Sequence, residues 1–167
     1  MRMNRLAVLA VLAALGLACG AAAAPASTPI ATADPAFVVV GAYDPLRDPA
    51  RDLQAAIAIA GPAHRRILLE VGGDWCPWCH TMDAFFNAHA DLMALRNQSY
   101  VLVKVNFSQG NENKAFLGQY PAIPGYPHIF ILDSAGKLLH SEDTSELEQG
   151  DSYNLERFKA FLQKWAG

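Results

Sequence analysis

The chain has 167 residues, of which 52% are hydrophobic, and it carries 13 basic against 16 acidic side chains. A chain of this length can build one compact domain with a sizeable core. The acidic excess argues against nucleic acid and anionic lipid as partners.

The N-terminus has the pattern of an export signal. Arg2 and Arg5 precede an apolar run at residues 6–17, and small residues follow. The run is too short to span a bilayer unaided, so we expect a signal peptide at residues 1–24 and a periplasmic or otherwise exported protein. An uncleaved N-terminal anchor is the alternative. Cys19 offers a possible site of lipid anchoring, but Gly16 stands where the lipoprotein pattern requires Leu.

The remaining chain divides into an N-terminal extension at residues 25–48, read as a linker over the domain, and a domain at residues 49–167. Asp48 and Pro49 predict a helix start, and Gly61-Pro62 predicts its end. Apolar spacing predicts one helix face from Cys79 to Met93, and Asn154 caps a final helix. A short helix is expected at residues 111–118, with Asn111 as its cap. Strands are expected at residues 67–71, 100–107, 128–132 and 137–140, the last two as a hairpin. This order, αβαβαββα, predicts an α/β fold with a central mixed sheet and helices on both faces.

The segment Cys76-Pro77-Trp78-Cys79-His80 carries the chemistry and has two interpretations. Cys-x-x-Cys between a strand and a helix is typical of a thiol–disulfide redox centre, whereas Cys-x-x-Cys-His in an exported protein is also the attachment motif of c-type haem. Haem would need His80 as an axial ligand and a second ligand elsewhere. The four strand signals argue against this interpretation, because small c-type cytochromes are largely helical. If Cys19 is removed with the signal peptide, Cys76 and Cys79 are the two cysteines that remain. A single pair excludes a scaffold of several structural disulfides.

With Trp75 before it, Glu70 in the preceding strand and Tyr126-Pro127 before the hairpin, this segment resembles the thioredoxin superfamily over residues 49–167. The resemblance implies a thioredoxin-like fold and thiol–disulfide exchange. Cys76, at the helix start, would be the exposed nucleophile, because unpaired backbone N–H groups and the helix dipole favour its thiolate. Cys79, one turn deeper, would resolve the mixed disulfide.

Glu70 interrupts an apolar strand just before the motif. The resemblance implies a carboxyl group buried beneath the second cysteine, where it can take the proton from Cys79 as that thiol attacks. The alternative is a surface glutamate paired with Arg65 or Arg66.

A substrate-binding surface is expected from Trp75, Trp78, Tyr126 and Pro127. The resemblance implies a cis peptide at Tyr126-Pro127. In that geometry the Tyr126 backbone could pair with an extended client segment, as in strand addition.

The sequence therefore predicts an exported protein thiol–disulfide oxidoreductase that needs no cofactor beyond its own Cys76–Cys79 disulfide. The reducing direction is favoured, because Glu70 and the absence of large insertions resemble the reducing branch of the superfamily. Expected partners are exported proteins with thiols or disulfides and a membrane electron donor. The alternative is a non-catalytic, chaperone-like module that binds extended chains through Trp75, Trp78 and Tyr126.

Overall fold

The computed structural model describes residues 37–167. The predicted signal peptide, Cys19 and the first part of the predicted extension lie outside these residues. Within residues 37–167, no helix is both long and apolar enough to cross a membrane.

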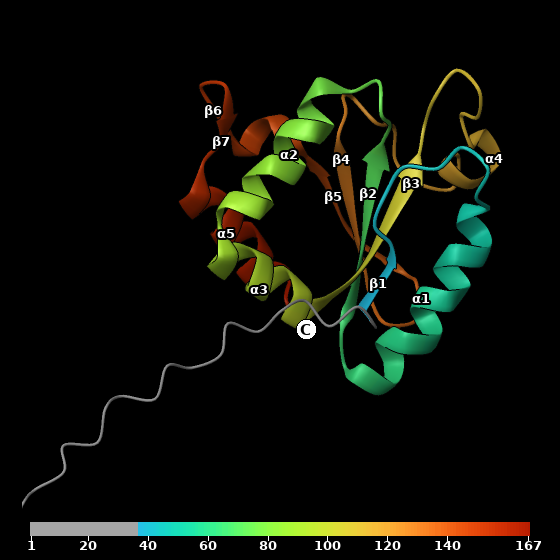
Figure 1. Ribbon diagram of the computed structural model, residues 1–167. Coiled ribbons are helices and arrows are strands. Elements are labelled where there is room, and N and C mark those ends of the chain that lie inside the picture. Colours follow the sequence, from blue (N-terminus) through green and yellow to red (C-terminus); the bar gives the residue numbers. More distant parts are fainter. Residues whose placement is uncertain (1–36) are drawn as a thin grey trace, which may run out of the picture. The chain divides into compact units, whose positions relative to one another are not determined.

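A five-stranded mixed sheet forms the centre of the described residues (Figure 1). Its strand order is β1-β3-β2-β4-β5. β1, β2 and β3 run parallel to one another, and β4 runs antiparallel to both β2 and β5. The strands are β1 (Val38–Val40), β2 (Arg66–Gly72), β3 (Tyr100–Asn106), β4 (His128–Leu132) and β5 (Leu138–Asp143).

Helices cover both faces of this sheet (Figure 1). On one face lie α1 (Pro49–Ala63) and the short α4 (Lys114–Leu117), and on the other lie α2 (Pro77–Ala88), α3 (Ala90–Ser99) and α5 (Leu155–Trp165). Between β5 and α5 the chain forms the 3-10 helix η2 (Thr144–Leu147) and a small hairpin of β6 (Glu148–Gln149) and β7 (Ser152–Tyr153). The predicted α/β class with a mixed central sheet is confirmed.

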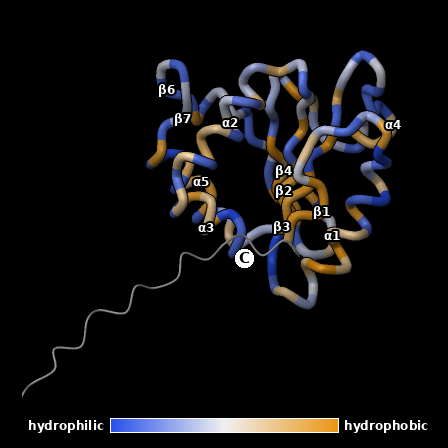
Figure 2. Tube along the Cα trace, in the orientation of Figure 1, coloured by the Kyte–Doolittle hydropathy of each residue, from blue (hydrophilic) through white to orange (hydrophobic). Residues whose placement is uncertain are grey.

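The central strands are buried on both faces, which explains their nearly continuous apolar sequences. Figure 2 shows the hydrophobic residues concentrated along these strands. Along β2, Leu68 packs under α2 and α5, whereas its neighbour Leu69 packs under α1. This alternation supplies one hydrophobic core to each helical layer.

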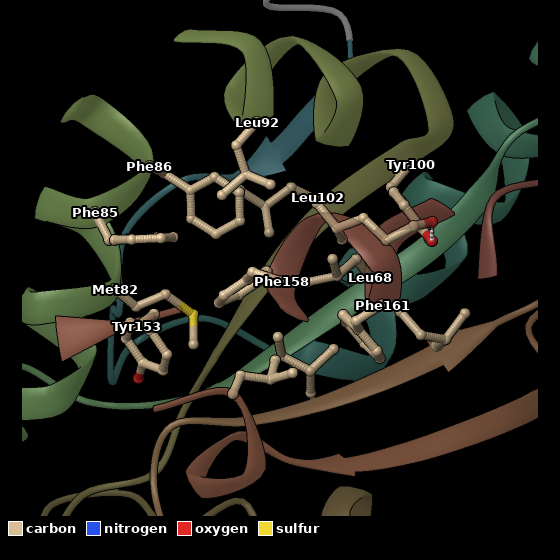
Figure 3. Close-up of a cluster of buried hydrophobic side chains, with 14 residues drawn as sticks. Leu68, Met82, Phe85, Phe86, Leu92, Tyr100, Leu102, Tyr153, Phe158 and Phe161 are labelled. Carbon is tan, nitrogen blue, oxygen red and sulfur yellow. Dashed lines mark hydrogen bonds between the residues drawn. The ribbon is translucent and has the colours of Figure 1, made fainter. Parts of the chain in front are cut away.

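Phe158 of α5 lies at the centre of the core beneath α2 (Figure 3). Its ring centroid lies 5.8, 5.1 and 5.4 Å from those of Phe85, Phe86 and Tyr153. Aromatic pairs at these separations add to the energy of burial. They hold α2, whose first turn carries the cysteine motif, against α5 and the β6–β7 hairpin.

Two predicted helix starts are confirmed by their caps. The Asp48 carboxylate accepts hydrogen bonds from the N–H groups of Ala50 and Arg51, at 3.0 and 3.4 Å. The Asn154 side chain accepts one from Arg157 N–H at 2.9 Å. Each cap satisfies donors that have no partner within the first turn of the helix.

Two predicted helix ends are wrong. α1 continues through Gly61 and Pro62 to Ala63, and it ends at His64, whose left-handed backbone lets its N–H reach the Ala60 and Gly61 carbonyls. The expected single helix from Cys79 to Met93 is two helices, α2 and α3. They meet at His89, whose backbone angles of −123° and 86° are not helical.

Other segments differ more strongly from prediction. Val38–Val40, within the segment predicted to be a linker, instead form the edge strand β1, which pairs with β3. α4 begins only after Asn113, and Asn111 instead accepts a hydrogen bond from the Asn113 N–H at 3.0 Å. β5 continues past the expected end at residue 140 to Asp143, and η2 and the β6–β7 hairpin follow it without a predicted counterpart.

Candidate redox site

The cysteine motif lies at the junction between β2 and α2. Cys76 is the N-cap of α2, with extended backbone angles of −93° and 109°, and Pro77 occupies the first turn. Pro77 suits this position because its fixed backbone angle matches the helix and its missing N–H would have had no helical partner. The Cys76 N–H donates to the Gly73 carbonyl at 3.0 Å, which closes the turn before the helix.

Cys76 and Cys79 are joined by a disulfide, with Cα atoms 5.3 Å apart. The Cys79 N–H donates to the Cys76 sulfur at 3.2 Å. When the bond is reduced, this N–H and the positive end of the α2 dipole favour a thiolate on Cys76. The arrangement can therefore carry out thiol–disulfide exchange.

The expected exposure of Cys76 is wrong for this oxidised form. Cys76 is 2% exposed and Cys79 0%. The rings of Tyr43, Trp78 and Tyr126 pack around the disulfide and exclude solvent from it. Access to the Cys76 sulfur therefore depends on these rings.

Glu70 lies in β2 and is 1% exposed. Its carboxyl oxygen accepts a hydrogen bond from the Tyr43 hydroxyl at 2.6 Å and lies 3.2 Å from Lys104 Nζ. The alternative pairing with Arg65 or Arg66 is wrong, because these side chains donate to backbone carbonyls.

Lys104 occupies the register position opposite Glu70 on β3, and its side chain is 3% exposed. Its ammonium group bridges Glu70 and Asp83, an α2 residue that is partly exposed. Sequence reasoning missed Lys104, although it interrupts an apolar strand just as Glu70 does. It also missed Tyr43, which lies in the segment interpreted as a linker and carries no comparable signal.

An aromatic surface borders the disulfide on the side of Tyr126. Trp75 is 54% exposed, and its indole N–H donates to the Phe107 carbonyl at 2.6 Å. The Trp75 ring meets Tyr126 edge-on at 5.6 Å, and Phe107 stacks on Tyr126 at 4.8 Å. The Tyr126–Pro127 peptide is cis, as expected, and Pro127 is buried.

Trp78 also packs against the disulfide and is half-buried. Its ring meets Tyr153 of β7 edge-on at 5.4 Å, and the Tyr153 hydroxyl donates to the Trp78 carbonyl at 3.4 Å. His80 lies on the exposed turn, with its Nε2 atom 2.8 Å from the Asp74 carbonyl oxygen. The structure therefore brings Trp75 together with Tyr126 and places Trp78 against the β6–β7 hairpin instead.

Two cysteines joined across the first turn of a helix that packs on a mixed sheet characterise the thioredoxin-like thiol–disulfide oxidoreductases. Residues 48–134, more than half of the chain, match the family model described as thioredoxin-like, and the chain belongs to this family. A search of curated proteins gave no match.

Solved structures with the same fold include a disulphide isomerase from Xylella fastidiosa Temecula1, 23% identical, with a TM-score of 0.61 over 73% of this chain and 94% of that one. The C-terminal domain of Neisseria meningitidis DsbD in the oxidised form is 18% identical, with a TM-score of 0.52 over 70% and 95%. The DsbH oxidoreductase is 24% identical, with a TM-score of 0.50 over 66% and 76%. These similarities confirm the thioredoxin-like fold.

Proposed function

We propose that this protein is an exported oxidoreductase that reduces disulfides in other exported proteins through Cys76 and Cys79. The observation that carries the proposal is the Cys76 sulfur at the N-terminus of α2, which accepts the Cys79 N–H. Export is inferred from the signal pattern of residues 1–24.

The reaction begins with the reduced protein. The Cys76 thiolate attacks a client disulfide, forms a mixed disulfide and releases one client thiolate. Cys79 then loses its proton and attacks the Cys76 sulfur, which restores the Cys76–Cys79 disulfide and releases the second client thiolate. Two electrons pass to the client, and a membrane electron donor would return the protein to its reduced form.

The reducing direction is supported by the buried acid beside the motif. Cys79 must give up a proton before it attacks, and Glu70 offers a nearby acceptor in a region closed to bulk water. The client would lie along Trp75, Trp78 and Tyr126, with the Tyr126 backbone beside Pro127 pairing with an extended segment. The acidic excess of the chain argues against nucleic acid as a partner.

Insulin reduction by the full chain tests the activity. We expect Cys76→Ser to abolish turnover and Cys79→Ala to accumulate mixed disulfides that mass spectrometry can identify. Cys19→Ser serves as the matched control and should behave as the parent. A protein that oxidises reduced RNase but leaves insulin intact would reverse the assigned direction.

A second candidate is the chaperone-like binding module, favoured by the 54% exposure of Trp75. In that case Cys76→Ser would retain full function in the cell, whereas Trp75→Ala would not. Covalent haem attachment, the third interpretation of the motif, would give a Soret band in the visible absorption spectrum of the exported protein.

A further inference from the structure

Tyr43 reaches the redox site from the segment that precedes α1. It is 7% exposed and packs with Cys76 and Cys79 in one small cluster. Its hydroxyl donates to the Glu70 carboxyl at 2.6 Å. A phenol from outside the cysteine motif therefore lies next to both the disulfide and the buried acid.

Gly72 keeps the space between this phenol and Cys79 open. A methyl group built on Gly72 would overlap the Cys79 sulfur and would lie 2.8 Å from the Tyr43 hydroxyl oxygen. The sulfur and the hydroxyl thus border the same small space beside the Gly72 backbone. The Tyr43 hydroxyl thus borders this space and is hydrogen-bonded to Glu70.

Burial and the neighbouring negative charge keep the Tyr43 hydroxyl protonated. Burial, followed by the neighbouring Glu70 carboxyl, raises the pKa of Tyr43 well above its ordinary value, and Asp83 and Tyr153 act in the same direction. Lys104 Nζ lies 4.7 Å from the centre of the Tyr43 ring. The titratable groups around Tyr43 come from β2 (Glu70), β3 (Lys104), α2 (Asp83 and Cys79), β7 (Tyr153) and the segment before β4 (Tyr126). A neutral phenol in such a position can accept one proton while it donates another.

We propose that the Tyr43 hydroxyl relays the proton of Cys79 to Glu70, an assignment that rests on the proposed thiol–disulfide exchange. The Cys79 S–H bond breaks and its proton passes to the Tyr43 oxygen, while the original Tyr43 proton passes to the Glu70 carboxylate. The Cys79 thiolate forms the bond to the Cys76 sulfur, and the client thiolate leaves. Glu70 later returns its proton to water. In the reverse reaction each step runs backwards.

Tyr43→Phe tests the relay, because it removes the hydroxyl and keeps the ring. The full chain, carrying Cys19→Ser in every variant, is reduced and mixed with glutathione disulfide. Acid quenching and alkylation then separate formation of the Cys76–glutathione mixed disulfide from its resolution by Cys79. At pH 7 we expect formation to be unchanged and resolution to slow by about 100-fold, the lower end of general acid–base effects.

The pH profile separates a relay from a structural role. The deficit of Tyr43→Phe should shrink as pH rises and disappear well above the ordinary thiol pKa of about 8.5, because Cys79 then loses its proton without the relay. Tyr100→Phe is the matched control, since it also loses a buried hydroxyl bond, from Tyr100 to the Leu162 carbonyl at 2.7 Å, at the other end of β3. It should resolve the mixed disulfide at the parental rate.

Two results would overturn the relay, namely unchanged resolution at pH 7 in Tyr43→Phe, or a deficit of the same size at every pH. Both are distinct from failure of the proposed function. If the proposed function itself is wrong, the parent protein would form no mixed disulfide with glutathione disulfide and would not reduce insulin.

Discussion

Replacing Gly72 with Ala should damage the site directly. The added methyl carbon would lie 2.8 Å from the Tyr43 hydroxyl oxygen and 3.0 Å from the ring carbon that carries it, besides overlapping the Cys79 sulfur. These neighbours cannot move aside easily, because one is an aromatic ring packed against the disulfide and the other is part of it.

The expected cost follows from these contacts. Overpacking of a rigid core costs about 1–3 kcal/mol. Displacing Tyr43 also weakens its hydrogen bond to Glu70, which adds about 1 kcal/mol. We therefore expect Gly72→Ala to lower the free energy of unfolding by about 2–4 kcal/mol, and Tm by about 5–15 °C for a chain of this size.

Urea unfolding of the oxidised protein, followed by tryptophan fluorescence, measures this loss. Gly61→Ala is the matched control, because Gly61 lies in α1 and a methyl group there would meet no atom within 4 Å. Alanine is the better helix former, so this variant should be as stable as the parent or more stable by up to about 1 kcal/mol. If Gly72→Ala unfolds at the same urea concentration as Gly61→Ala, the assigned contact between Cys79, Gly72 and Tyr43 is wrong.

Three further predictions concern buried charge, pH and helix capping. Lys104→Met leaves the buried Glu70 without its cation and should cost about 3 kcal/mol. Adding Glu70→Gln should recover part of this loss in urea unfolding, and an additive double mutant would contradict the pairing. Burial lowers the pKa of His128, so the folded state binds fewer protons than the unfolded state just below about pH 6.5. The contribution of neutral His128 to the free energy of unfolding should be fully present above about pH 6.5 and should be lost as the pH falls below it. His128→Asn should flatten this slope between pH 5 and 7, and an unchanged slope would exclude His128 as its source. Asp48→Ala should lower the free energy of unfolding by about 1 kcal/mol, because α1 loses its N-cap. Asp48→Ser can still cap the helix and should keep most of the parental stability in thermal unfolding.

The parts of the fold that the sequence predicted well depend on local chemistry. Asp48 and Asn154 cap helices through atoms within three residues of themselves. The motif from Cys76 to Cys79 forms its own helix start. Glu70 stood out because a carboxyl group in an apolar strand needs a specific partner, although the sequence did not indicate that the partners are Tyr43 and Lys104.

The missed features depend on contacts between distant residues. β1 is three valines long, too short to show alternation, and it forms by pairing with β3 far along the chain. The sequence did not predict the break at His89, because α2 and α3 pack on the same face of the sheet and the apolar spacing continues from one helix to the next. The burial of Cys76 likewise arises from rings of Tyr43 and Tyr126, which only the fold brings to it.

The position of Tyr43 sets the N-terminal limit of any fragment that is to contain the whole redox site. The family match begins at residue 48, after both β1 and Tyr43. A recombinant fragment trimmed to that boundary would keep both cysteines and Glu70, yet it would lack the sheet's edge strand and the phenol beneath the disulfide. The segment that matches the family model is thus shorter than the segment that packs around the disulfide, and trimming to the matched segment would remove Tyr43 from the redox site.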